Sequence, residues 1–285
     1  MTSDGTTSPA GDAIPVPDEE APGWPDDHPA FDTSVAHQAR IYDYLLGGKD
    51  NYAADRAAGE AMIAAYPGIV QLVRANRAFL GQAVRSLAGE AGIRQFLDIG
   101  TGVPAAGSTH EVAQEATPGC RVVYVDYDPV VLAHARALLT SSEEGSCDYI
   151  DADFRDTGAI LAQAAGTLDF SRPVGVLLLA ILHAVGDSDD PHALVARFME
   201  AVPPGSYLAI SHPAADIEPA AAAELTKRLN PLSYQQYTPR SRAEVARFFD
   251  GLDLIEPGLV PVDQWRPGNK PARATACWAG VARKR

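Results

Sequence analysis

Three aspartates stand at or near the ends of apolar runs, and two glycines follow the first of them. Asp98 lies in "FLDIGTG", ahead of Gly100 and Gly102. Asp126 ends "RVVYVD", and Asp153 lies in "CDYIDADF". Glycine backbone at such a bend can approach a ligand closely, and the N-terminus of a following helix attracts negative charge. Because acids at neighbouring strand ends can accept hydrogen bonds from sugar hydroxyls, this pattern indicates a nucleoside-bearing cofactor.

The charge of these groups distinguishes among such cofactors. Asp126 lies 26 positions after Gly100, where its carboxylate can accept from both ribose hydroxyls and would repel a 2′-phosphate. With Ala105 in place of a third glycine, the bend alone is a loose motif that steric reasons can also explain. A pyrophosphate gains nothing from Asp98, whereas a ligand with an ammonium and a sulfonium does. We therefore expect S-adenosylmethionine, whose carboxylate can use the helix N-terminus.

Further residues at the strand ends are expected to complete the cofactor site. Asp153 can accept from the adenine amino group and Phe154 can pack on the base, although Asp153 could instead cap the next helix. Asp156 and Asp128 are expected to be helix caps. The predicted cofactor-binding residues are Asp98, Gly100, Thr101, Gly102, Asp126, Tyr127, Asp153, Phe154 and Ala180.

Two histidines follow predicted strands and could act on an acceptor. His183 comes after "VGVLLLAIL", at the sheet edge expected to lie nearest the transferred methyl group, and is the candidate general base. The alternative is a histidine held by the segment that follows. His212, in "SHP", could line the acceptor pocket or simply turn the chain. No cysteine follows the fourth predicted strand, and the acids at 187–190 are typical of a helix cap, so we expect neither a covalent nucleophile nor a metal.

Three helices are predicted before the first strand, at 34–46, 52–66 and 68–89. The turn "GGKDNY" joins the first two, and the segment is predicted to form a lid over the acceptor. Asn51 or Asp50 could instead cap the second helix. Asn76 falls on the apolar stripe of the third helix, where a buried amide needs partners. The residues predicted to line the acceptor pocket are Tyr44, Lys49, Asn51, Tyr52 and His212.

From residue 95 onward, apolar runs alternate with helical patterns, which indicates a parallel sheet covered on both faces. Ser241 and Glu244 predict a capping box, and Asp190 with Pro191 predicts a helix start. The last two strands, at 252–260 and 274–283, are joined by a loop too short for a helical crossover, so they are expected to be antiparallel. The fold class is therefore α/β, with a seven-stranded Rossmann-like sheet. The five parallel strands are predicted at 95–100, 121–128, 147–154, 174–182 and 206–212, and the intervening helices at 107–116, 129–140, 156–166 and 191–202.

Length and composition set the wider limits. The 285 residues divide into a predicted disordered acidic tail at 1–30, a helical lid at 31–92 and a cofactor-binding core at 93–285. The formal net charge of −14 disfavours nucleic acid. The apolar run at 174–185 is too short to span a membrane, and the three cysteines are scattered. We expect a cytoplasmic monomer or homodimer that acts on a small molecule.

Several longer segments carry a family resemblance: "ARIYDYLLGGKDNYAADR", "RANRAFL", "FLDIGTGVP", "THEVAQ", "VVYVDYDPVVLAHARALL" and "RFFDGLDLIEPGLV". Together, over roughly residues 33 to 283, they resemble the actinobacterial S-adenosylmethionine-dependent methyltransferases long treated as a domain of unknown function. The resemblance implies the class I methyltransferase sheet and the cofactor, but no acceptor. Pro104 and Ala105 stand where such proteins often have Pro-Thr. The alternatives are a non-catalytic S-adenosylmethionine-binding regulator and an NAD-dependent oxidoreductase, and Asp98 argues against the latter.

Overall fold

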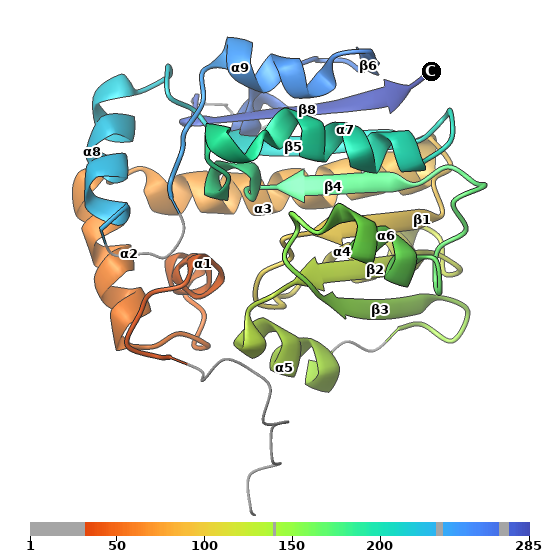
Figure 1. Ribbon diagram of the computed structural model, residues 1–285, viewed down its shortest axis with the longest axis horizontal. Coiled ribbons are helices and arrows are strands. Elements are labelled where there is room, and N and C mark those ends of the chain that lie inside the picture. The colour runs from red at the N-terminus through yellow and green to blue at the C-terminus, as the bar shows by residue number, and fades with distance from the viewer. Residues whose placement is uncertain (1–31, 139–140, 232–235, 268–273) are drawn as a thin grey trace, which may run out of the picture. The chain divides into compact units, whose positions relative to one another are not determined.

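A mixed sheet lies at the centre of the compact unit formed by residues Thr33–Arg285. The computed structural model describes residues 32–138, 141–231, 236–267 and 274–285. The described strands follow the spatial order β3-β2-β1-β4-β5-β8-β6, with β7 also paired to β8 (Figure 1). Their bounds are Gln95–Ile99 (β1), Arg121–Asp126 (β2), Ser146–Asp151 (β3), Gly175–Leu179 (β4), Tyr207–Pro213 (β5), Leu252–Leu254 (β6), Val260–Pro261 (β7) and Cys277–Lys284 (β8).

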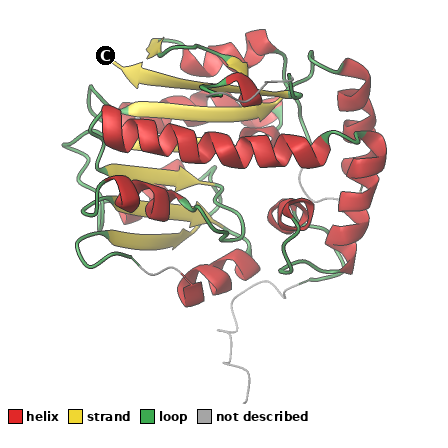
Figure 2. Cartoon of the chain, turned by 180° about the vertical axis from the view of Figure 1, so that it is seen from behind, coloured by secondary structure: helices red, strands yellow, loops and turns green. Residues whose placement is uncertain are grey.

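Helices cover both faces of this sheet. The long helix α3 and α4 lie over one face, and α6 and α7 over the other (Figures 1 and 2). Helices α1, α2 and α8 lie beyond the carboxyl ends of the parallel strands (Figure 1). The bounds are Gln38–Leu46 (α1), Ala53–Ala65 (α2), Ile69–Arg85 (α3), Thr109–Ala116 (α4), Pro129–Leu138 (α5), Thr157–Ala164 (α6), Pro191–Ala201 (α7), Pro219–Leu229 (α8) and Arg242–Ala246 (α9).

The apolar strands supply a core on each side of the sheet because successive side chains point to opposite faces. Phe96 belongs to the core cluster that contains Phe79 of α3. Its neighbour Leu97 belongs to the other cluster, with Ile160 of α6 and Phe198 of α7. All five residues of β1 and all five of β4 are buried, as expected of strands covered on both faces.

The predicted fold class is confirmed, with a change of detail in the closing strands. Strands β3, β2, β1, β4 and β5 are parallel, and β8 runs antiparallel to both β5 and β6. The predicted strand at 252–260 forms two short strands, β6 and β7, instead of one. Pro257 interrupts this run, and proline has no backbone N–H to give to a strand ladder.

The helix starts behave as the sequence predicts, but one helix was not predicted. Asp190 caps α7 ahead of Pro191, and Ser241 forms the capping box of α9 with Glu244. Helix α8 was missed because alanines occupy most of its first two turns, so its apolar periodicity is weak. The predicted tail at 1–30 and the last two residues of the helix at 129–140 lie outside the described residues. Among the described residues, no helix has both the length and the apolar character that crossing a membrane requires.

Candidate functional site

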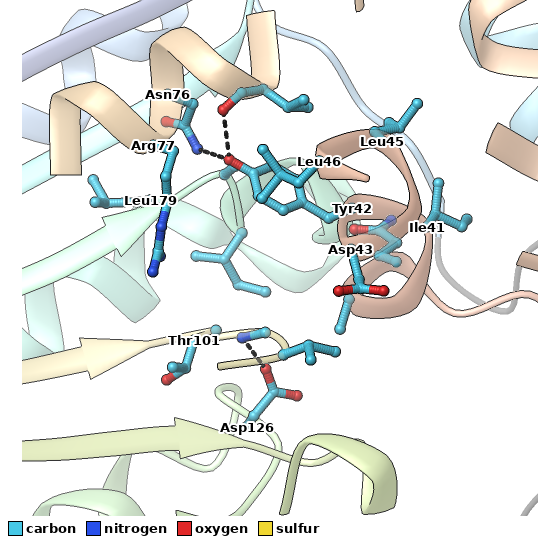
Figure 3. Close-up of a pocket in the computed structure, with 18 of the residues that line it drawn as sticks. Ile41, Tyr42, Asp43, Leu45, Leu46, Asn76, Arg77, Thr101, Asp126 and Leu179 are labelled. Atoms are coloured by element: carbon cyan, nitrogen blue, oxygen red, sulfur yellow. Dashed lines mark hydrogen bonds between the residues drawn. The ribbon is translucent and has the colours of Figure 1, made fainter. Parts of the chain in front are cut away.

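A cavity of about 390 Å³ lies between the carboxyl ends of β1, β2 and β4 and the helices α1, α2 and α3. Its strand side is formed mainly by the loops that follow those three strands, and its helix side by α1, α2, α3 and the residues Leu229 and Tyr237. Figure 3 shows Thr101 and Asp126 on the strand side, facing Tyr42, Leu46 and Asn76 on the helix side. The predicted site residues that line the cavity are Asp98, Gly100, Thr101, Gly102, Asp126, Tyr127, Phe154, Ala180 and His183.

The glycine bend after β1 adopts a backbone that few other residues could adopt. Gly100 and Gly102 have φ angles of 75° and 67°, in the left-handed region. A Cβ on Gly100 would lie 2.5 Å from the side chain of Ile181. The Gly102 N–H donates to the Asp126 carboxylate at 2.8 Å, which holds the bend against the end of β2 (Figure 3). The bend is therefore part of a rigid strand side.

Asp126 is buried and organises the backbone around it. Besides Gly102, its carboxylate accepts from the backbone N–H groups of Tyr127 at 2.9 Å and Asp128 at 3.1 Å. Burial raises the pKa of Asp126, and these backbone hydrogen bonds oppose that rise. The carboxylate faces a cavity at the end of β2, as a ribose-binding acid would.

Asp98 is a buried acid within the strand side. Its carboxylate accepts from the Thr109 hydroxyl at 2.6 Å, and the side chain is 4% exposed. Burial raises the pKa of Asp98 to about 6, against the hydrogen bond from Thr109 and the charge of Arg77. A buried carboxylate of this kind is stabilised by a cation, so the cavity offers a place for a positively charged group.

The structure separates the two residues predicted at the adenine end. Phe154 is buried and lines the cavity, whereas Asp153 does not line it. Asp153 instead accepts from the backbone N–H of Arg155 at 2.9 Å and pairs with its guanidinium at 3.0 Å. Asp156 caps α6, and Asp128 accepts from the N–H of Val130 at the start of α5, as predicted for both.

Of the two predicted histidines, His183 after β4 lines the cavity, whereas His212 in β5 does not. His183 lines the cavity, and its Nδ1 is buried and has no hydrogen-bond partner in the part of the chain that the structure describes. Burial, together with the charge of nearby Arg240, lowers the pKa of His183 to about 4, so the ring is neutral at pH 7. His212 is fully buried and does not line the cavity. Its Nε2 faces an Arg240 nitrogen at 3.0 Å and its Nδ1 faces the Pro213 carbonyl at 3.0 Å, so both ring nitrogens are occupied.

The residues that the sequence predicted for the acceptor pocket, at the end of α1 and in the turn before α2, do not line the cavity. Tyr44 faces Gly59 of α2, and its hydroxyl donates to Glu60. Asn51 donates to the Asp43 carboxylate at 2.8 Å and so closes the turn. Lys49 is exposed, and the Tyr52 side chain is 36% exposed. None of the predicted pocket residues Tyr44, Lys49, Asn51, Tyr52 and His212 lines the cavity.

The helix side is lined instead by residues that the sequence did not single out for an acceptor. Tyr42 receives a hydrogen bond from the Asn76 amide at 2.9 Å and donates to the Val73 carbonyl at 3.0 Å (Figure 3). Asn76 thus ties α3 to α1, and its Oδ1 is buried without a partner among the residues that the structure describes. Arg77 also lines the cavity, and its Nε is buried without a partner in the same described part of the chain. The apolar stripe of α1, which includes Tyr42 and Leu46, was the available signal.

The chain as a whole resembles known proteins. A profile described as S-adenosyl methyltransferase matches residues 25–285. The chain belongs to this family. A DUF574 family protein from Streptomyces avermitilis is 44% identical over 90% of this chain and 100% of its own, with a TM-score of 0.87. A candidate methyltransferase from Thermobifida fusca is 38% identical over 90% of this chain and 97% of its own, with a TM-score of 0.82.

A more distant likeness concerns the fold alone. An O-methyltransferase family protein from Burkholderia thailandensis is 14% identical over 72% of this chain and 55% of its own, with a TM-score of 0.50. No curated protein matches the sequence. The chain is therefore an S-adenosylmethionine-dependent methyltransferase with the class I fold, and its near relatives come from actinobacteria.

The residues of the cavity fit this cofactor. Asp98 is a buried acid that a positive group would stabilise, and Arg77 has a buried nitrogen without a partner that suits a carboxylate. Asp126 lies at the end of β2, where its carboxylate could hold the ribose, and Phe154 and Tyr127 line the same side, where their rings could pack on the base. The cavity thus has acidic, basic and aromatic groups for the corresponding parts of one zwitterionic nucleoside.

Proposed function

We propose that this methyltransferase acts on a small, largely apolar molecule that carries one hydroxyl or amine, and that His183 removes the proton from that group. S-adenosylmethionine, when bound, supplies an electrophilic methyl group on its sulfonium. The chain's own residues then have to hold the acceptor atom in line with this methyl group, keep water out and take a proton.

The helix side of the cavity supports an apolar acceptor. It is lined by aliphatic and aromatic side chains from α1, α2, α3 and α8, with few polar atoms between them. Pockets of this kind bind apolar ligands and use the few polar groups to fix their orientation. Its apolar lining residues include Leu45, Leu46, Met62, Leu72, Val73 and Leu229.

The observation that carries the proposal is the unpartnered Nδ1 of His183. A buried polar atom normally has a hydrogen-bond partner, and this one lies on a residue that lines the cavity. Because the pKa of His183 is lowered to about 4, the ring is in the proton-accepting form throughout the neutral range. The Asn76 Oδ1, also buried and unpartnered, can accept a hydrogen bond from the acceptor and fix its orientation.

The test measures transfer of a labelled methyl group from S-adenosylmethionine to a panel of phenols, aliphatic alcohols and amines, and to small molecules extracted from cells. His183→Ala should lower turnover by roughly 10²- to 10⁴-fold, the usual contribution of general base catalysis, and leave the affinity for S-adenosylhomocysteine unchanged. The matched control is His134→Ala, because His134 lies on α5 and does not line the cavity. Full turnover in His183→Ala, or transfer only to proteins or nucleic acids, would contradict the proposal.

A further inference from the structure

His37 lies immediately before α1, where it meets the loop after β2. Its ring contacts the Tyr127 ring edge-on, with 5.4 Å between the two ring centroids. Its Nδ1 lies 2.6 Å from the Asp128 carboxylate. The residue lines the cavity, and its Nε2 is buried and has no hydrogen-bond partner among the described residues. His37 was not among the residues that the sequence singled out.

The short contact with Asp128 decides which ring nitrogen is available. A nitrogen and a carboxylate oxygen 2.6 Å apart need a proton between them, so Nδ1 of His37 donates to Asp128. The Ala39 N–H approaches the same nitrogen only at 3.4 Å, too long to compete. The pKa of Asp128 agrees: burial would raise it, but the hydrogen bond from His37 contributes to a net lowering. Nε2 is therefore the ring nitrogen left to pair with a ligand hydroxyl, which can both donate and accept a hydrogen bond.

A buried cluster of His37, Arg40, Asp55 and Asp128 fixes the position of this ring. The His37 backbone N–H donates to Asp55 at 2.9 Å. The Arg40 Nε lies 3.4 Å from Asp55 and 3.6 Å from Asp128. Asp55 and Asp128 are 0% and 2% exposed, so the cluster ties the starts of α1 and α2 to the β2 end of the cavity. His37 is thus held in place by the protein before any ligand binds.

The hydrogen bonds already made by Asp126 leave little room for a ribose. A carboxylate has about four lone-pair positions. Asp126 uses three of them for the backbone N–H groups of Gly102, Tyr127 and Asp128. One position remains, whereas a ribose has two hydroxyl groups. Asp126 therefore has room for one ribose hydroxyl and not for the two that the sequence predicted. The second hydroxyl needs another partner nearby.

We propose that His37 is a cofactor-binding residue: its Nε2 pairs with one ribose hydroxyl of S-adenosylmethionine, and Asp126 pairs with the other. Asp128 is a positioning residue that holds the ring. His37 interacts electrostatically with Asp126 and touches Tyr127, which places it at the ribose and adenine end rather than beside His183. The proposal requires the cofactor but neither the acceptor nor the base, so it stands or falls separately from the proposed function.

The test is calorimetric titration with S-adenosylhomocysteine and with its 2′-deoxy and 3′-deoxy analogues. The wild type should lose about three- to tenfold in affinity on removal of either hydroxyl, the usual worth of a hydrogen bond. His37→Ala should bind S-adenosylhomocysteine more weakly by a similar factor and become indifferent to the loss of one hydroxyl. It should stay sensitive to the loss of the other. The matched control His134→Ala, on a partly exposed histidine paired with Asp50, should behave like the wild type.

Two conservative variants distinguish a direct contact between His37 and the ribose from a purely structural role of His37. Glutamine can donate to Asp128 and accept from a hydroxyl, so His37→Gln should recover part of the lost selectivity. Asp128→Asn keeps an acceptor for the ring N–H and should retain the selectivity, whereas Asp128→Ala should lose it. If His37→Ala melts too early for titration, His37→Leu replaces it. Equal weakening for all three ligands in the His37 variant, or wild-type selectivity between them, would overturn the proposal.

Discussion

The strand side and the helix side of the cavity are built in different ways. On the strand side, sheet register fixes the residues: Asp98 aligns with Tyr124 of β2 and Leu177 of β4. Backbone N–H groups then hold the Asp126 carboxylate. On the helix side, side chains from α1, α2, α3 and α8 meet across long sequence separations. Apart from His37, Asp43, Asn76 and Arg77, this lining is mainly apolar.

This difference indicates which side of the cavity tolerates amino-acid substitutions. A parallel sheet sets the distance between neighbouring strand ends, and the Asp98 and Asp126 carboxylates on the strand side already accept hydrogen bonds. Substitutions there disturb many hydrogen bonds at once. On the helix side, replacing one aliphatic side chain by another changes the shape of the cavity at small cost. We infer that the strand side is specialised for a constant cofactor, and the helix side for whichever acceptor the protein uses.

The largest expected loss of cofactor affinity comes from adding a single methyl group to the glycine bend on the strand side. Gly100→Ala places a Cβ 2.5 Å from Ile181 and forces an L-residue into the left-handed region, a strain of about 1–2 kcal/mol before the clash is counted. Titration with S-adenosylhomocysteine should show a loss of affinity of at least about a hundredfold. Gly107→Ala is the matched control, because Gly107 has φ 76° and nothing within 4 Å of the added Cβ. It should lose stability but keep its affinity, and equal affinities in the two variants would contradict the rigid bend.

A smaller effect is expected when one polar group of the strand side is removed. Asp126→Ala should lose about 1.5–3 kcal/mol of cofactor binding, which is about ten- to a hundredfold in affinity. Asp156→Ala removes an acid that only caps α6, so it should cost about 1 kcal/mol of stability and leave the affinity unchanged. Calorimetry and thermal melting of both variants measure this. If folded Asp126→Ala keeps the wild-type affinity, Asp126 is not a cofactor-binding residue.

The sequence predicted the strand side well, because strand ends and glycine bends are local signals. The parallel strands, the bend and the acids at 98 and 126 all follow from short motifs whose positions the sheet then aligns. The fold departed from prediction where local signals are weak, at the alanine-rich α8 and at the strand interrupted by Pro257. Asp153 lies at a strand end as expected, but the neighbouring Arg155 pairs with it, and such a contact has no sequence signature.

The helix side was predicted poorly for a geometric reason. Each helical residue is rotated by about 100° from the one before, so Tyr42 and Tyr44 point in very different directions. Tyr42 belongs to the apolar stripe of α1 and faces the cavity, whereas Tyr44 packs against α2. The sequence prediction took polar and aromatic residues from the turn. The apolar face of α1, which a sequence pattern normally assigns to the hydrophobic core, lines the cavity instead. How α1 docks on the sheet depends on distant contacts such as that between His37 and Asp128.

The pH dependence of cofactor binding tests the charge on the strand side. Because burial raises the pKa of Asp98 to about 6, the free protein protonates this group below that pH. A cationic ligand favours the ionised form, so affinity should be complete above about pH 6 and fall by up to about tenfold per unit below it. S-adenosylhomocysteine, which carries the ammonium, is titrated from pH 5 to 7.5. Asp98→Asn should bind more weakly and show little change with pH; if its acid limb matches the wild type, another group is responsible.

The smallest expected effect lies in the turn between α1 and α2, where the sequence predicted part of a lid. Asn51 donates to the Asp43 carboxylate at 2.8 Å and to the Gly48 carbonyl at 3.0 Å, so its side chain closes the turn. Asn51→Ala should cost about 1 kcal/mol of stability, the worth of an ordinary hydrogen bond, and leave cofactor affinity and turnover per folded molecule unchanged. Leu46→Ala, at the end of α1 and in the cavity lining, should instead raise the KM for the acceptor. Thermal melting and methyl-transfer kinetics of the two variants show whether the turn is structural or contacts the acceptor. Collapse of turnover in a fully stable Asn51→Ala would show that the turn reaches the acceptor and that the helix side extends beyond the lining residues of α1.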